Sequence, residues 1–270
     1  MARKSATINV MEAAARRAGR GLIRDFGEVE QLQVSRNSPA DFVSKAELKA
    51  EQILRAELSK ARPSFGLLIE ELGATEGTDN EQLWIVDPLD GKTNFLHGIP
   101  HFAISIGLEE RGELTAGVIY EPVRDELFWA EKGAGAYLNR RRIRVSSRGQ
   151  IGDAILATGI PFGKRPGKEE FVSIIQPVME LAAGVRHFGS AALDLAYVAA
   201  GRYEGFWEFG LAPWDVAAGI IIVREAGGML SEIGGGTNIL RGGSIIATND
   251  LLHAPMQRLI RDTTHGARMA

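Results

Sequence analysis

Apolar residues recur at spacings of three and four near the start of the chain, a pattern typical of a helix with one buried face. It predicts a first helix that buries Ile8, Met11, Ala15, Ala18, Leu22 and Phe26. The same spacing predicts a second helix from about Asp41 to Lys60, which Pro63 prevents from continuing. Glu47 and Glu57 both fall on its apolar face. The pattern therefore predicts that each is buried or faces a site, and it does not choose between them.

Short apolar runs separated by turn residues follow, and they predict strands at 65–69, 83–86, 102–108, 115–120, 126–130 and 142–146. The third and fourth of these strands flank a polar tip at Arg111 and Gly112, which predicts a hairpin.

From about residue 150 strands and helices alternate. Strands are predicted at 153–160, 184–189 and 204–208, and helices at 169–184, 190–201 and 214–228. The glycine-rich run at 234–238 is typical of a loop. This order favours a mixed α+β and α/β fold in two lobes, an N-terminal α+β lobe at 1–150 and a C-terminal α/β lobe at 151–270.

Composition narrows the function classes. The net charge of -3 over 270 residues provides no basic surface for direct nucleic-acid binding. The chain has no cysteine, which excludes thiolate catalysis and cysteine-bound zinc. The longest apolar run, at 217–223, is too short to cross a membrane. Because Arg16, Arg17 and Arg20 interrupt the first apolar segment, we expect no export signal and therefore a cytoplasmic enzyme.

The segment VDPLDGKTNFLHG at 86–98 carries the first candidate chemistry. Gly91, Lys92 and Thr93 match the end of a phosphate-binding P-loop, but that motif needs a glycine where Val86 stands. Asp87 and Asp90 would also repel the phosphates that such a loop binds. The sequence therefore excludes a P-loop.

Two other interpretations of this segment stay open. Asp87, Asp90 and the intervening carbonyl of Leu89 could form half of a Mg²⁺ coordination shell at the end of a strand. Alternatively, the segment is a turn in which Asp90 caps a helix that starts near Lys92.

Acids elsewhere favour the metal site. Glu70 and Glu71 follow a predicted strand, and Asp215 lies in the first turn of a predicted helix, where capping alone would explain it. Together with the absence of cysteine and of a GxSxG motif, these acids favour two-metal hydrolysis over covalent acyl transfer. His97 and His101 have a zinc-like spacing, but Gly98 and Pro100 disfavour a shared helix.

Four segments resemble the inositol monophosphatase family in its bacterial inositol-1-monophosphatase form: IEE at 69–71, WIVDPLDGKTNFLHGIPHFAISIGL at 84–108, GSAALDLAYVAAGRYEGFWE at 189–208 and PWDVAAGIIIVREAGG at 213–228. The resemblance implies a layered αβαβα sandwich of the inositol monophosphatase and fructose-1,6-bisphosphatase type. It also implies a homodimer and lithium-sensitive hydrolysis of phosphate monoesters with two or three Mg²⁺ ions.

Family roles transfer to matching positions of this chain. The resemblance implies metal binding by Glu70, Asp87, the carbonyl of Leu89, Asp90 and Asp215. It implies that phosphate lies across the metals and against Gly91, Lys92 and Thr93, and that Gly189, Ser190 and Ala191 line the alcohol side of the substrate. Glu208 matches the acid that accepts hydrogen bonds from inositol hydroxyls, although an exposed acid at a strand end would fit the sequence equally.

Three positions depart from the family pattern. Glu47 stands where the family has an aspartate, Lys92 where it has a threonine, and Ile69 where it commonly has a glycine. The aspartate and threonine hold the attacking water in the family, so Glu47, Glu70, Lys92 and Thr93 are the candidate catalytic positions. Glu47 has one methylene more than the aspartate of the family, and Lys92 carries an ammonium where the family has a hydroxyl. We therefore predict an ion pair between Glu47 and Lys92.

Two consequences of this pair compete. Lys92 could add positive charge for the phosphate or stand in for a third cation. It could instead repel metal and occupy the place of the water, which leaves a slow enzyme or a binding protein with an accessory role in transcription or RNA processing. Since all the metal-binding acids are present, we expect a phosphatase of myo-inositol 1-phosphate or a similar polyol phosphate. Fructose 1,6-bisphosphate, histidinol phosphate and adenosine 3′,5′-bisphosphate are the alternative substrates.

Overall fold

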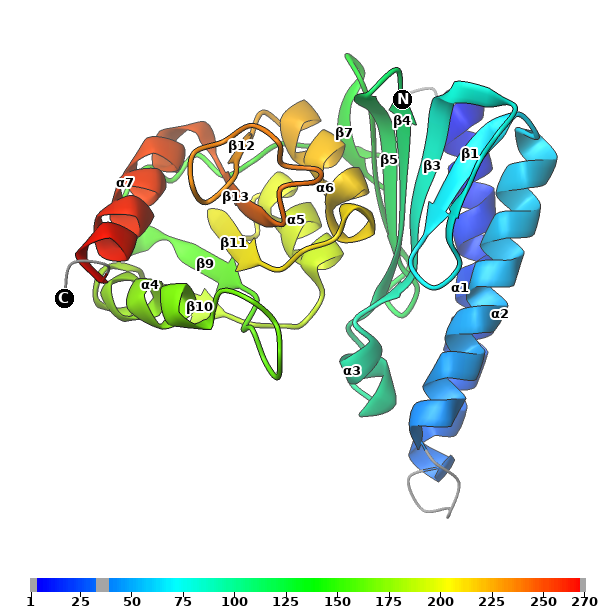
Figure 1. Cartoon of the computed structure of the whole chain (residues 1–270), viewed down its shortest axis with the longest axis horizontal. Coiled ribbons are helices and arrows are strands. Elements are labelled where there is room, and N and C mark those ends of the chain that lie inside the picture. The colour runs from blue at the N-terminus through cyan, green and yellow to red at the C-terminus, as the bar shows by residue number, and fades with distance from the viewer. Residues whose placement is uncertain (1–3, 33–38, 268–270) are drawn as a thin grey trace.

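Three layers of helices alternate with two sheets in the computed structural model, which describes residues 4–32 and 39–267 (Figure 1). Helices α1 (Ala6–Leu32) and α2 (Pro39–Ala61) pack together over one face of the first sheet. Helices α5 (Ala191–Ala199) and α6 (Pro213–Glu225) lie between the two sheets. Helices α4 (Lys168–Leu181) and α7 (Asp250–Ala267) cover the far face of the second sheet. This arrangement confirms the predicted αβαβα sandwich.

The first sheet has the order β2-β1-β3-β4-β5-β6-β7-β8. Its strands are β1 (Phe65–Ile69), β2 (Gly73–Thr75), β3 (Asp79–Asp90), β4 (Ala103–Glu110), β5 (Glu113–Glu121), β6 (Glu126–Glu131), β7 (Gly135–Leu138) and β8 (Arg141–Ile143). The predicted hairpin joins β4 to β5, with Arg111 and Gly112 at positive φ in its turn. The strand predicted at 142–146 is wrong beyond Ile143.

The second sheet has the order β10-β9-β11-β13-β12. Its strands are β9 (Ile155–Thr158), β10 (Gly184–Arg186), β11 (Gly205–Phe209), β12 (Met229–Ser231) and β13 (Ser244–Thr248). Strand β9 pairs in parallel with β10 and β11, whereas β13 runs antiparallel to β11 and β12. The predicted strand at 184–189 is wrong beyond Arg186, because the chain there leaves the sheet.

The two helices at the start of the chain form as their apolar pattern predicts. Five of the six residues expected to be buried in α1 are buried, and the sixth, Phe26, is partly buried and packs against the rings of Phe95 and Phe102. In α2 the structure distinguishes between Glu47 and Glu57, which the sequence pattern could not do. Glu57 pairs with Arg17 at 2.6 Å, while Glu47 is buried and faces the end of the first sheet. No helix among the described residues has both the length and the apolar character to span a membrane.

A pair of glycines lets α6 approach the first sheet closely. Gly107 in β4 and Gly117 in β5 lie opposite each other in the sheet. A Cβ on Gly107 would lie 2.7 Å from the Cβ of Ala217, and one on Gly117 would lie 2.8 Å from the carbonyl oxygen of Ala218. Because ordinary carbon contacts are about 3.5–4.0 Å, only glycine fits beneath this helix. The contact fixes the first turn of α6, where Asp215 lies, against the sheet.

Candidate active site

The end of strand β3 presents Asp87 and Asp90 on either side of an irregularity in its pairing with β4. The backbone N–H of Leu89 donates to Oδ1 of Asp87 at 2.8 Å, and the Asp87 side chain is buried. Gly91 then turns the chain at a φ of 96° into the short helix α3 (Lys92–Leu96). A Cβ at Gly91 would lie 2.9 Å from the carbonyl oxygen of His101, so the turn requires glycine for space as well as for φ.

Asp90 caps a helix, but not the one that its sequence position suggested. Helix α3 begins without a side-chain cap, so that alternative is wrong. Oδ2 of Asp90 accepts hydrogen bonds from Oγ of Ser190 at 2.6 Å and from the N–H of Ala192 at 2.8 Å. Ser190 is itself the N-cap of α5. The hydrogen bond therefore joins the end of β3 to the start of α5, a hundred residues later in the chain.

Asp215 lies at the start of α6 and accepts a hydrogen bond at Oδ2 from the N–H of Ala212 at 2.7 Å. The capping interpretation of Asp215 is therefore confirmed. The same side chain also lines a cavity with Asp87 and Asp90. Capping and a site function are thus compatible at this position.

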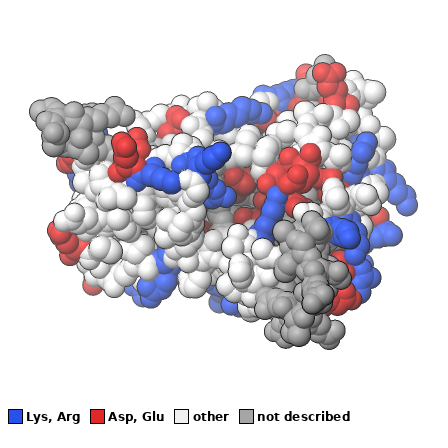
Figure 2. All heavy atoms as spheres, turned by 60° about the horizontal axis from the view of Figure 1, so that its bottom comes forward, with Lys and Arg blue, Asp and Glu red and all other residues white. Residues whose placement is uncertain are grey.

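This cavity has a volume of about 260 Å³ and lies between the two sheets. On the face turned forward in Figure 2, acidic side chains gather around a central hollow with Lys and Arg atoms at its rim. The cavity contains every candidate metal or substrate residue from the sequence: Glu70, Asp87, Leu89, Asp90, Gly91, Lys92, Thr93, Gly189, Ser190, Ala191, Glu208 and Asp215. Glu47 is not part of the wall and reaches the site through Lys92.

Burial and neighbouring negative charges destabilise the charged forms of the three aspartates. Burial and then the charges of Asp90, Glu70 and Asp215 raise the pKa of Asp87 well above its ordinary value. Burial raises the pKa of Asp90 to about 6, against the hydrogen bonds from Ser190 and Ala192. Burial and the charge of Asp90 raise the pKa of Asp215 to about 7. A divalent cation bound between such carboxylates would reverse these shifts, because an opposite charge favours the ionised form.

Lys92 lies among three glutamates at one side of the cavity. Its Nζ is 2.7 Å from Oε1 of Glu47, 2.9 Å from Oε1 of Glu70 and 2.9 Å from Oε1 of Glu71, and the Glu71 contact has hydrogen-bond geometry. The predicted pair between Glu47 and Lys92 is therefore present and is part of a larger group. Burial alone would lower the pKa of Lys92, but the three glutamates outweigh it and raise that pKa. Burial also raises the pKa of Glu47, against the attraction of Lys92.

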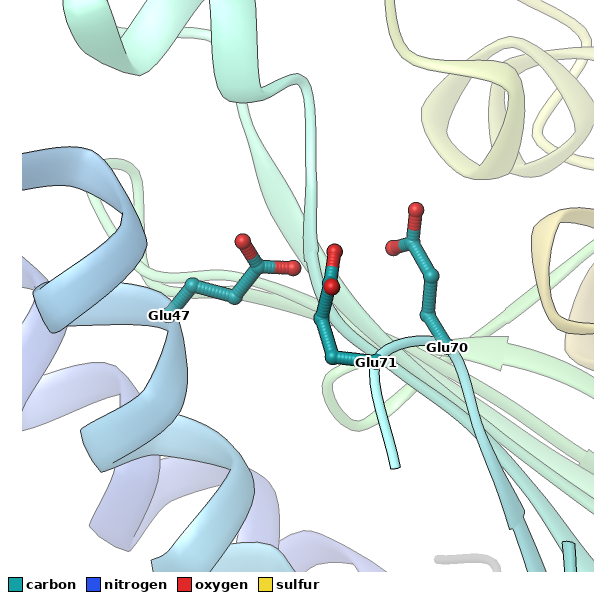
Figure 3. A group of neighbouring side chains, drawn as sticks. All are labelled: Glu47, Glu70 and Glu71. Carbon is teal, nitrogen blue, oxygen red and sulfur yellow. The ribbon is translucent and has the colours of Figure 1, made fainter. Parts of the chain in front are cut away.

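Figure 3 shows how these three acids converge. Glu47 extends from α2, while Glu70 and Glu71 follow the end of β1. Among the described residues they are the one group of three potential metal ligands in which one ligand atom from each residue lies within 4.8 Å of the other two. The group includes neither His97 nor His101, and α3 ends at Leu96 before both histidines. The two histidines therefore do not share a helix, as Gly98 and Pro100 indicated.

The cavity is also lined by residues that the sequence did not single out: Gly159, Arg165, His187, Asp194 and Leu211. Glu208 is 7% exposed and not a solvated acid at a strand end, so that interpretation is wrong. Burial raises its pKa to about 8, and Nη1 of Arg165 lies 3.5 Å from its Oε1. A Cβ on Gly159 would lie 1.9 Å from the Glu208 carboxyl carbon, so this glycine leaves room for the acid.

Comparisons with known proteins agree on one family. The model of the inositol monophosphatase family matches residues 3–265. A Mesorhizobium japonicum protein named inositol-1-monophosphatase is 54% identical over 258 residues, which are 96% of this chain and 97% of that protein. The Escherichia coli K12 protein named Nus factor SuhB is 41% identical over 255 residues, which are 94% of this chain and 96% of that protein.

Solved structures give the same result. The native crystal structure of extragenic suppressor protein suhB from Bartonella henselae has a TM-score of 0.89 and 54% identity, over 95% of this chain and 99% of that chain. An inositol monophosphatase from Anabaena has a TM-score of 0.82 and 37% identity, over 94% of this chain and 95% of that chain.

Proposed function

Because the chain belongs to the inositol monophosphatase family, we propose that it is a metal-dependent phosphatase that hydrolyses the phosphate monoester of a small polyol, such as myo-inositol 1-phosphate. The observation that carries this proposal is the single cavity in which Glu70, Asp87, Asp90 and Asp215 meet. Four acids around one cavity, which Lys92 neutralises only in part, suit a site that binds cations and a phosphate together.

The donor set fits Mg²⁺, which prefers carboxylate and carbonyl oxygens. We propose that two or three ions are held by Glu70, Asp87, the carbonyl of Leu89, Asp90 and Asp215. When bound, such ions lower the pKa of a coordinated water and neutralise charge on the phosphate and the leaving alkoxide.

The chain's own groups hold the acids in place before any ion arrives. Backbone N–H groups of Leu89 and Ala212 each fix one oxygen of Asp87 and Asp215, at 2.8 Å and 2.7 Å. Ser190 and Ala192 fix Oδ2 of Asp90. Such bonds around metal ligands set their orientation and are worth about 10- to 100-fold in affinity or activity.

Substrate recognition follows from the remaining cavity residues. The proposal places the phosphate against the backbone of Gly91, Lys92 and Thr93, and the alcohol against Gly189, Ser190 and Ala191, all of which line the cavity. Glu208, buried opposite Gly159, would accept hydrogen bonds from substrate hydroxyls. A polyol offers several hydroxyls at this depth, which favours it over a nucleotide.

Phosphate release from a panel of substrates tests the proposal. We expect release from myo-inositol 1-phosphate that requires Mg²⁺, stops with chelator, and falls by about 100-fold or more in Asp215→Asn. Fructose 1,6-bisphosphate, histidinol phosphate and adenosine 3′,5′-bisphosphate should react more slowly. Absence of metal-dependent release from every substrate would contradict the proposal, and preference for the adenosine compound would contradict the role of Glu208.

Two observations favour a second function, that of a regulatory binding protein. Lys92 neutralises part of the acidic group at the site, and Nus factor SuhB is among the similar proteins. The variant Glu47→Asp, Lys92→Thr separates the two functions. If only this variant releases phosphate, the natural chain acts by binding.

The family resemblance also leads us to propose a homodimer that works in the cytoplasm and is inhibited by lithium. Sedimentation velocity tests the dimer, and a lithium titration of phosphate release tests the inhibition.

A further inference from the structure

The carboxylates of three glutamates and the ammonium of Lys92 lie in contact beside the cavity. Glu47, Glu70 and Glu71, shown in Figure 3, each have one carboxylate oxygen within 4.8 Å of those of the other two. Lys92 Nζ lies within 2.9 Å of each of the three acids. The Glu47 side chain is only 5% exposed, so its charge is weakly screened by water. Like charges this close repel strongly, and the group therefore needs a cation to stay assembled.

We infer that the Lys92 ammonium is a built-in cation that occupies the place of a divalent metal ion between Glu47, Glu70 and Glu71. It holds these acids together without metal, and the chain therefore binds one divalent ion fewer than its acids could hold. The inference rests on the proposed function, since it assumes that the remaining acids bind metal.

An ammonium and a metal ion exclude each other at this position. Mg²⁺ binds oxygen at about 2.0–2.1 Å, whereas Lys92 Nζ already lies at 2.7 Å and 2.9 Å from the carboxylate oxygens of Glu47 and Glu70. The lysine is also tethered, so it competes at a high effective concentration.

An ammonium in the place of a metal ion changes the chemistry of the site as well as the number of bound ions. An ammonium neutralises charge but does not coordinate and activate a water. Glu70 contacts Lys92 and also lines the cavity with the aspartates, so Lys92 is a positioning residue that acts through Glu70.

Metal counting tests this directly, without an activity assay. Purified wild type, Lys92→Thr and Lys92→Met are titrated with Mn²⁺, and bound ions per chain are counted by electron paramagnetic resonance. The matched control is Lys49→Thr, because Lys49 also pairs with a buried acid, Asp25, at 3.0 Å, but outside the cavity. Melting temperatures of all four proteins are measured with chelator and with Mn²⁺.

We expect each Lys92 variant to bind one more Mn²⁺ than wild type and Lys49→Thr to bind the same number as wild type. With chelator the Lys92 variants should melt about 5 °C below wild type, and Mn²⁺ should restore them. Lys92→Met keeps the apolar stem, so it provides a second test if Lys92→Thr does not fold.

Equal non-zero counts in wild type and both Lys92 variants would overturn the inference and leave the proposed function standing. No bound ion in any protein would overturn both. An extra ion in Lys49→Thr as well would overturn the inference, because the gain would not depend on the glutamates.

Discussion

The close contact between α6 and the first sheet leads to a prediction about Gly107→Ala. The new Cβ would lie 2.7 Å from the Cβ of Ala217, about 1 Å inside an ordinary carbon contact. Because Ala217 is on a helix and Gly107 in a central strand, neither side can rotate away, and the helix or the strand must shift. Overpacking of this kind costs about 1–3 kcal/mol, which lowers the melting temperature by roughly 2–4 °C per kcal/mol in a domain of this size.

Asp215 lies two residues before Ala217, so the shift should also reach the active site. A displacement of about 1 Å can cost about 100-fold in rate. Gly107→Ala should therefore lose both stability and metal-dependent phosphate release.

The rescue variant is Gly107→Ala, Ala217→Gly, which moves the methyl group from the helix to the strand. Ala217→Gly alone should cost about 1 kcal/mol from helix propensity. The double variant should be more stable than the sum of the two changes by about 1 kcal/mol or more. The control Gly27→Ala places a methyl in open space on α1 and should stabilise slightly. Additive losses, or an unchanged melting temperature for Gly107→Ala, would refute the steric explanation.

Three further predictions follow from single contacts. Ser190→Ala removes the N-cap of α5 and a hydrogen bond to Asp90, and should lower the unfolding free energy by about 1–2 kcal/mol in urea titrations. Glu208→Ala should raise the KM for myo-inositol 1-phosphate about tenfold or more in steady-state assays. The same variant should raise the KM for a phosphate ester without further hydroxyls by a smaller factor. Burial, and then the charge of Arg124, lowers the pKa of His101 to about 4 from its ordinary value near 6.5. The unfolded chain therefore binds a proton that the folded chain does not. As the pH falls from 7 to 5, this histidine should lower the free energy of unfolding by about 2 kcal/mol. Urea titrations at the two pH values should show this loss in the wild type and not in His101→Gln.

Much of the fold could be predicted from the sequence, because long segments with a helical apolar period, such as α1 and α2, are identified as helices by their own pattern. Other elements were harder to predict. Strands β2 and β12 have only three residues each and depend on their neighbours for stability, so no local pattern identifies them. Helix α7 was missed although its buried residues Leu252, Met256 and Ile260 recur every four positions, because Pro255 inside it is unusual for a helix.

The residues of the site also divide into those that the sequence predicted and those that it did not. The acids at the ends of strands and helices were predictable because their sequence positions imply a shared edge of the fold. Arg165 and His187 were not, since one lies in the loop before α4 and the other follows the early end of β10. The choice of Glu47 over Glu57 also depends on packing, because only the former meets Lys92.

The hydrogen bond between Ser190 and Asp90 has a consequence for synthesis of the chain. When a ribosome has translated the chain as far as β8, it has made Glu70, Asp87 and Asp90, but neither Ser190 nor Asp215. Until α5 and α6 emerge and dock on the sheet, Asp90 lacks its hydrogen bonds from Ser190 and Ala192, and the cavity lacks Asp215. The first half of the chain therefore cannot form the acid site alone, and the site is completed only after most of the chain has been made.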